Sequence, residues 1–170
     1  MCDILIVDGY NIVNAWPELI KLKNESFEHA RDRLLGILAN YQGLDGCLVV
    51  VVFDAHLVKG GTGARENYAG VEVIFTQEGE TADSCIERLV TLLPEKMSVT
   101  VATSDWAQQR LVMGQGALRL SARELLEKIK ESGSFTRSAK DKLRNPNITI
   151  NDVIDKDIRS TLEKWRRGKK

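Results

Sequence analysis

Apolar runs alternate with helical patterns along most of the chain. The clearest run is the continuous β-branched stretch Cys47–Phe53, which is typical of a central strand buried on both faces. This alternation predicts an α/β fold of three layers, α/β/α, with a central, mostly parallel sheet. The remaining strands are expected at Asp3–Asp8, Val71–Phe75, Ser98–Thr103 and Ala117–Leu120.

Helices are expected between these strands, where apolar residues recur every three to four positions. Their ends carry capping signals, of which the clearest is the capping box SARE at residues 121–124. Pro94 is a second signal, because proline ends the helix that precedes it. The expected helices run from Ser26 to about Tyr41, from Thr81 to Leu93, from Asp105 to about Met113, and onward from Ser121.

The periodic pattern weakens after Gly133. We therefore expect one domain over residues 1–133 and an extension over residues 134–170, with a turn at Asn145–Asn147 and a final helix at Ile154–Trp165. A chain of 170 residues is long enough for one proper hydrophobic core.

Charge is distributed unevenly, although the net charge is zero. Residues 1–120 hold 10 Lys/Arg against 16 Asp/Glu, a net charge of −6, and residues 121–170 hold 14 against 8, a net charge of +6. An acidic body with a basic arm favours a polyanionic partner, although a solvated helix face would give the same composition.

The three cysteines, Cys2, Cys47 and Cys85, stand in unrelated contexts without metal-binding spacing. They are expected to be reduced thiols, which is typical of a cytoplasmic protein. The chain starts directly on a strand and has no long apolar span, so neither secretion nor a membrane partner is expected. A monomer is the expected state.

Several carboxylates follow the predicted strands. Asp8 ends the first strand, Asp54 ends the second, and Asp105 follows the fourth. Because the carboxyl ends of parallel strands meet at one edge of a sheet, these side chains should converge. Asp83 lies on the inward stripe of a helix at the same edge, and Glu80 is a candidate fifth member. Taken singly, each acid could instead be a helix cap, a helix-start charge or a strand end.

Such a cluster of like charges requires a partner, because neighbouring carboxylates raise one another's pKa. A divalent cation removes the repulsion, and oxygen ligands suit Mg²⁺ or Mn²⁺. No histidine or cysteine is placed to join them, so zinc is not expected in this cluster. Asn11 and Ser104 would orient carboxylates or waters. A site of this kind activates water and stabilises charge on a phosphoryl group.

Four short motifs in this order are specific as a set: DGYN at 8–11, FDA at 53–55, ETAD at 80–83 and TSD at 103–105. Together they resemble the NYN-domain ribonucleases, a branch of the PIN-like fold, and the YacP-like members above all. The resemblance extends over most of the chain, through AHLVKG at 55–60, GQGALR at 114–119, SARELL at 121–126 and EKWRRG at 163–168.

The resemblance implies a metal-dependent endoribonuclease that cleaves messenger RNA with Mg²⁺, or Mn²⁺, as cofactor. Asp8, Asp83 and Asp105 would then be the core catalytic acids and metal ligands. The ribosome is an implied partner, because YacP-like members are linked to ribosome-dependent cleavage. Supporting catalytic positions would be Asn11, Asp54, Glu80 and Ser104.

RNA would be held by the long glycine-rich loop Ala55–Gly70 and by the basic arm. Phosphate contacts there would give an affinity that falls with salt. The loop could equally be a flexible connector. The candidate RNA-binding residues are Lys59, Arg65, Tyr68, Arg123, Lys140, Arg144, Arg166 and Arg167.

Two other functions fit part of the pattern. A magnesium-dependent phosphatase of haloacid-dehalogenase type also starts with an aspartate at a strand end, but it needs a second acid where this chain has Tyr10. An inactive RNA- or ribosome-binding module could keep the same fold, although the intact set of acids argues against it.

Overall fold

The computed structural model of the chain describes residues 2–55 and 63–133. Several predictions therefore lie outside the described residues, among them the turn and helix expected after residue 133 and five of the candidate RNA contacts. Those five contacts are Lys59, Lys140, Arg144, Arg166 and Arg167.

The described part of the chain contains one sheet of six strands in the order β3-β4-β2-β1-β5-β6. All neighbouring pairs are parallel except β3 and β4, which are antiparallel. The fold predicted from the alternation, with a mostly parallel sheet, is thereby confirmed. The strands are β1 (Ile4–Asp8), β2 (Leu48–Phe53), β3 (Arg65–Tyr68), β4 (Val71–Phe75), β5 (Val99–Ala102) and β6 (Leu118–Leu120).

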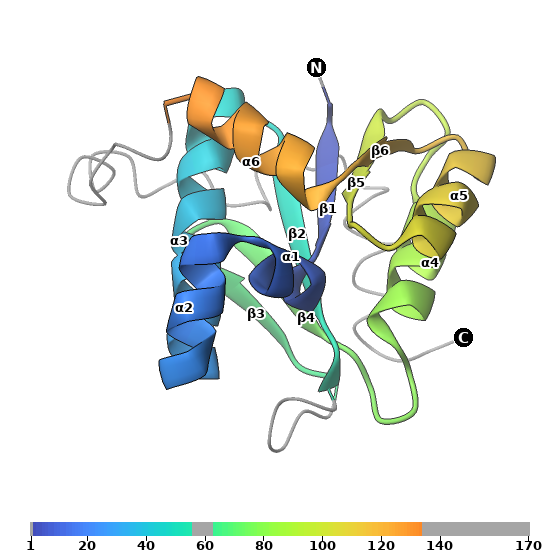
Figure 1. Cartoon of the computed structure of the whole chain (residues 1–170). Coiled ribbons are helices and arrows are strands. Elements are labelled where there is room, and N and C mark those ends of the chain that lie inside the picture. The colour runs from blue at the N-terminus through green and yellow to red at the C-terminus, as the bar shows by residue number, and fades with distance from the viewer. Residues whose placement is uncertain (1, 56–62, 134–170) are drawn as a thin grey trace.

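Helices cover both faces of this sheet (Figure 1). Their bounds are α1 (Gly9–Ala15), α2 (Pro17–Glu25), α3 (Phe27–Asp45), α4 (Ala82–Leu92), α5 (Trp106–Gly114) and α6 (Ala122–Glu131). The predicted caps are present: Ser26 accepts a hydrogen bond from the N–H of His29, and residues 121–124 form the capping box.

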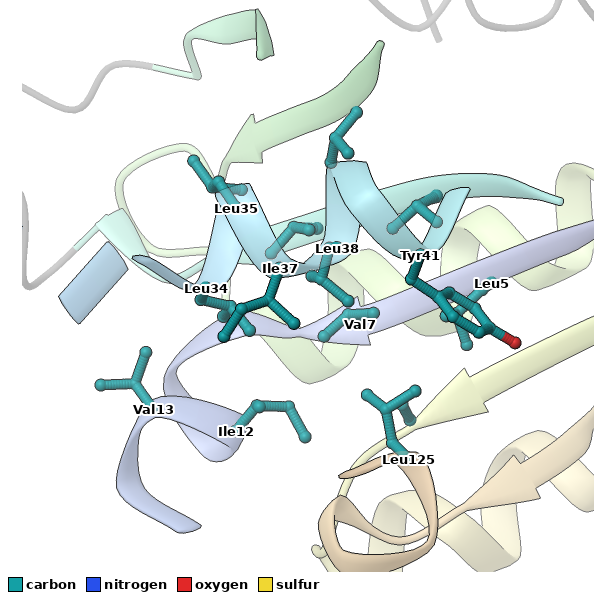
Figure 2. Packing of buried hydrophobic residues seen from close by; sticks show 14 of the residues in the cluster. Leu5, Val7, Ile12, Val13, Leu34, Leu35, Ile37, Leu38, Tyr41 and Leu125 are labelled. Carbon is teal, nitrogen blue, oxygen red and sulfur yellow. The ribbon is translucent and has the colours of Figure 1, made fainter. Parts of the chain in front are cut away.

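Two hydrophobic cores lie on opposite faces of the sheet, because successive side chains of a strand alternate between faces. Leu5 and Val7 of β1 join the core that α1, α2, α3 and α6 cover, whereas Ile4 and Ile6 join the core under α4 and α5. Figure 2 shows α3 above β1, with residues of its buried stripe turned toward the strand. That stripe includes Leu34, Leu35, Ile37, Leu38 and Tyr41.

Three elements were not predicted. Helices α1 and α2 occupy the stretch after Asp8, where Pro17 begins the second helix directly after the first has ended. The region expected to be a loop, Ala55–Gly70, contains β3, which forms an antiparallel hairpin with β4. The sequence pattern does not predict β3, because this edge strand, Arg-Glu-Asn-Tyr, has no alternation of apolar and polar residues.

Among the helices described, none has the length and apolar character that crossing a membrane would require.

Candidate functional site

The carboxyl edge of the sheet has a reversal of strand order at its centre. From β1 the chain builds β2 and β4 on one side and then returns to build β5 and β6 on the other. In open α/β sheets such a switch point is the usual place for ligands. Asp8 is the last residue of β1, and Asp105 follows β5.

Asp8 is the most buried of the candidate acids, with 7% of its surface exposed. It caps α1 and accepts a hydrogen bond from the N–H of Asn11 over 3.4 Å. Burial, as the largest cause, and the charges of Asp83, Asp105 and Asp54 together raise the pKa of Asp8 to about 7, against the lowering effect of that N–H. The charges of the three other acids therefore reach Asp8 at this edge.

Asp83 reaches the same cluster from the first turn of α4. Burial raises its pKa, and the charges of Asp105 and Asp54 add to the effect. Asp83 is nevertheless exposed at the surface of the protein. The cluster thus has a buried member, Asp8, and a member open to solvent, which is where a substrate could approach.

Asp105 combines two roles that the sequence left as alternatives. Its Oδ1 accepts hydrogen bonds from the N–H groups of Ala107, over 2.8 Å, and Gln108, over 3.2 Å, and so caps α5. Both capping bonds end on Oδ1, so capping does not use the second carboxylate oxygen, Oδ2. The charge of Asp105 also acts on Asp8 and Asp83. Capping fixes the carboxylate without removing it from the cluster.

Asn11 and Ser104 connect three elements around the acids. The side-chain oxygen of Asn11 accepts the N–H of Ser104 over 2.7 Å. The hydroxyl oxygen of Ser104 in turn accepts the N–H of Ala122 over 3.1 Å. These bonds tie α1 to the segment before α5 and that segment to the start of α6. The two residues thus hold the segment that carries Asp105, and their predicted role in orienting carboxylates or waters stays a prediction.

Replacing Asn11 with alanine should remove the bond that holds the segment before Asp105. Ser104 is exposed, so water can replace the lost acceptor, and the loss of unfolding free energy should stay at about 1 kcal/mol. Activity should fall more than stability, because Asp105 follows Ser104 directly. Chemical denaturation and RNA cleavage would be measured together.

The matched control is Asn14→Ala on the same helix. Asn14 accepts a hydrogen bond from the exposed amino group of Lys23, a kind of contact that contributes little. Equal losses of activity in the two variants would contradict the positioning role of Asn11.

Glu80, the fifth candidate acid, and the candidate RNA contacts Arg65 and Tyr68 have other surroundings. Glu80 is paired with Arg88 over 2.7 Å, and its charge is not among those that act on the pKa of Asp83. Arg65 lies on β3 and forms an ion pair with Glu72. Tyr68 ends β3 with 39% of its surface exposed.

Arg123 lies at the start of α6, and its side chain is 87% exposed. Its guanidinium is 3.1 Å from the carboxylate of Glu127. An exposed pair of this kind is weak, so it would not prevent a phosphate contact.

Two residues that the sequence did not single out support the site. Gly9 follows Asp8, and a Cβ there would lie 2.3 Å from the ring of Phe53, so the absence of a side chain lets the ring pack under α1. Gln109 donates from its amide to the buried carbonyl of Thr103, while the Thr103 hydroxyl accepts the N–H of Asp105. Thr103 could have been noticed from the sequence because it is part of the TSD motif. Gln109 lies in no such motif, so no sequence signal gave a reason to select it.

Comparison with known proteins places the chain in a family. The model of the YacP-like NYN domain matches residues 5–167. The chain belongs to the YacP-like NYN domain family. The resemblance predicted from the four motifs is thereby confirmed.

A relative from Bacillus subtilis (strain 168), named YacP, is 47% identical over 167 residues, which cover 98% of each chain. The crystal structure of B. subtilis Rae1 (YacP) has a TM-score of 0.68 and 47% identity, covering 98% of this chain and 95% of that one. A crystal structure of a single-substitution variant of Rae1 has the same TM-score with 42% identity, covering 98% and 96%. The relation thus extends beyond the described residues to nearly the whole chain.

Membership of the YacP-like NYN domain family supports a nuclease, with RNA as the kind of partner.

Among the described residues, the acidic cluster offers carboxylate oxygens as its only charged groups. A buried acid with a pKa near neutrality, surrounded by three more carboxylates, would gain from a divalent cation. In the described ranges, no three of these acids have oxygens within 4.8 Å of one another. Three of these acids as placed therefore do not all contact one ion directly, and a bound Mg²⁺, which keeps several waters, would reach at least one of them through water.

Proposed function

We propose that this protein is a metal-dependent endoribonuclease that cleaves messenger RNA in association with the ribosome. The observation that carries the proposal is the convergence of Asp8, Asp54, Asp83 and Asp105 at the switch point of the sheet, in a chain of the YacP-like NYN domain family. The ribosome enters through the resemblance of the motifs to ribosome-dependent members of that family.

Asp8, Asp83 and Asp105 would hold Mg²⁺ or Mn²⁺ directly or through its waters, and the charge of Asp54 acts on Asp8 and Asp83. The bound cation would supply charge stabilisation at the phosphoryl group and a water of lowered pKa. Asp8 would be the fixed ligand, because it is buried and held at the start of α1. Asp83 is exposed and would face the RNA.

The other groups of the site would keep these acids in position. Asn11 and Ser104 fix the segment that carries Asp105, and capping of α5 fixes its carboxylate. Thr103 and Gln109 hold the same segment from the inner side. Glu80, which precedes α4, would act through its ion pair with Arg88 of that helix, rather than on the cation.

The proposal predicts cleavage of a labelled messenger RNA in Mg²⁺ and loss of cleavage in EDTA. The RNA would be tested free and on translating ribosomes. Cleavage in both settings would indicate a self-sufficient nuclease, and cleavage on ribosomes alone would assign the ribosome a role in presenting the RNA. Restoration by Mn²⁺ after EDTA treatment would distinguish metal dependence from damage to the protein.

Asp3→Asn is the matched control for the acids, because Asp3 precedes the amino end of the strand that Asp8 ends. Asp3 accepts the N–H of Ser98 over 2.8 Å, a bond that asparagine can also accept. The control should cleave as the parent chain does. If no RNA is cleaved in either setting although the protein binds it, the binding-module alternative replaces the nuclease.

A further inference from the structure

A second cluster of metal-ligating groups lies at the opposite edge of the sheet from Asp8. The sulfur atoms of Cys2 and Cys47 and a carboxylate oxygen of Asp45 all lie within 4.8 Å of one another. Cys2 is 7% exposed, Cys47 is 1% exposed, and Asp45 is half-buried. Within residues 2–55 and 63–133, no other three His, Cys, Asp or Glu side chains come so close.

The fold brings these residues together through one tight turn and one strand pairing. Asp45 is the last residue of α3, and Gly46 follows with φ of 80°, a conformation that glycine adopts without strain. The turn returns the chain at Cys47, directly before β2. Cys2 lies beside it because β1 and β2 are paired, as the 3.0 Å bond from the N–H of Leu48 to the carbonyl of Asp3 shows.

Asp45 and Cys2 each have a neighbour outside the cluster that would orient them. The buried hydroxyl of Tyr41 is hydrogen-bonded to Asp45. The hydroxyl of Thr100 is hydrogen-bonded to Cys2, and the positive charge of Lys128 acts on the same sulfur. Outer contacts of this kind hold the ligands of protein metal sites in position.

We propose that Cys2, Cys47 and Asp45 form a zinc-binding site, separate from the acidic cluster. Sulfur ligands favour zinc over the hard cations that carboxylates alone prefer. Zinc takes four ligands, so three protein groups would leave one position for water. Two thiolates and a carboxylate carry a charge of −3, which Zn²⁺ and the nearby Lys128 would together neutralise.

The site would join the end of α3 to the starts of β1 and β2. Its expected effect is therefore to tie these three elements together, at the edge of the sheet opposite the acids that would act on RNA. The expectation that the three cysteines are unrelated is corrected for Cys2 and Cys47, whose closeness no local spacing reveals. Cys85 lies in the other hydrophobic core and belongs to no such group.

Cobalt titration of the reduced, metal-free full-length protein tests the site. Co²⁺ bound by thiolates gives a near-ultraviolet charge-transfer band, whereas Co²⁺ bound by carboxylates alone does not. We expect the band to saturate at one ion per chain and to disappear when Zn²⁺ is added. Zn²⁺ should also raise the melting temperature of the parent chain.

Four variants complete the test. Cys2→Ser and Cys47→Ser should lose the band, and their circular dichroism would confirm that they fold. Cys85→Ser and Asp8→Asn should keep the band, since both residues lie outside the proposed site. Absence of the band in the reduced parent chain, or its persistence in folded Cys2→Ser, would overturn the proposal. If Cys2 and Cys47 form a disulfide in the purified protein and the thiols released by reduction give no cobalt band, the proposal would also be overturned. None of these results bears on the nuclease, whose failure would show in RNA cleavage alone.

Discussion

Asp8→Asn should abolish RNA cleavage and at the same time make the folded protein more stable at neutral pH. Burial raises the pKa of Asp8 from its ordinary value of 3.8 to about 7, with the neighbouring carboxylates adding to the effect. The folded state therefore holds this proton more tightly than the unfolded chain does. Above the ordinary pKa, each further rise in pH favours unfolding until the carboxyl of the folded state has also ionised, which happens as the pH passes through about 7 and above it.

The size of the effect follows from the same values. One pKa unit corresponds to about 1.4 kcal/mol, so the rise to about 7 sets a ceiling of roughly 4 kcal/mol on the destabilisation that charged Asp8 causes. Asparagine is uncharged and keeps an oxygen for the N–H of Asn11. At pH 8, without metal, we expect the variant to gain on the order of 2 kcal/mol, and at pH 4 the gain should be close to zero.

Activity should change in the opposite direction. Loss of one group that holds charge in an active site commonly reduces the rate on the order of 10²-fold or more. Denaturant unfolding at pH 4 and pH 8 in EDTA would be combined with RNA cleavage in Mg²⁺. Addition of Mg²⁺ should stabilise the parent chain and leave Asp8→Asn largely unaffected. An Asp8→Asn protein that is less stable than the parent chain at pH 8 would contradict the account of Asp8 as a buried acid under charge repulsion.

Gly9→Ala should disrupt the site through packing alone. In an isolated helix this substitution would be favourable by up to about 1 kcal/mol. Here the new Cβ would lie 2.3 Å from the ring of Phe53, which is fully buried and packed against Tyr10 and Phe75. Overpacking of this kind commonly costs about 1–3 kcal/mol, so it outweighs the gain in helix propensity.

Either the ring or the start of α1 must move, and Asp8 immediately precedes Gly9. We therefore expect Gly9→Ala to reduce unfolding free energy by about 2 kcal/mol and cleavage by tenfold or more. A second substitution, Phe53→Leu, should restore part of both by making room for the new methyl group.

Gly36→Ala provides the matched control. Gly36 lies within α3, and no atom lies within 4 Å of the position that its Cβ would take. Alanine there should stabilise the protein by about 0.5–1 kcal/mol and leave cleavage unchanged. Equal behaviour of the two variants in denaturation would show that the contact of Gly9 with Phe53 does not matter.

The sequence predicted those parts of the fold whose physical signal is local. β2 reads as a β-branched run because it is buried on both faces, and α6 is marked by its capping box. α1 is short and starts directly after a strand, so no separate apolar stripe announces it. β3 is held by pairing with β4 rather than by an apolar pattern of its own.

The same distinction between local signals and contacts made only in the folded chain applies to the candidate site. Asp8, Asp54 and Asp105 could be grouped from sequence because strand ends share an edge in a parallel sheet. The pairing of Glu80 with Arg88 depends on side-chain direction, which spacing alone does not specify. The meeting of Cys2 with Cys47 depends on the register of β1 against β2, which appears only in the folded chain.

The central place of β1 has a consequence for the order in which the protein can be made. β1 is the first strand synthesised, yet one of its two neighbours, β5, comes late in the chain. Asp105 comes later still, and Ser104 receives its bond from Ala122 only once α6 has begun. A growing chain therefore carries Asp8 long before the rest of its cluster exists. Whatever the acidic site does to RNA, the nascent protein cannot do it until most of the described domain has left the ribosome that is making it.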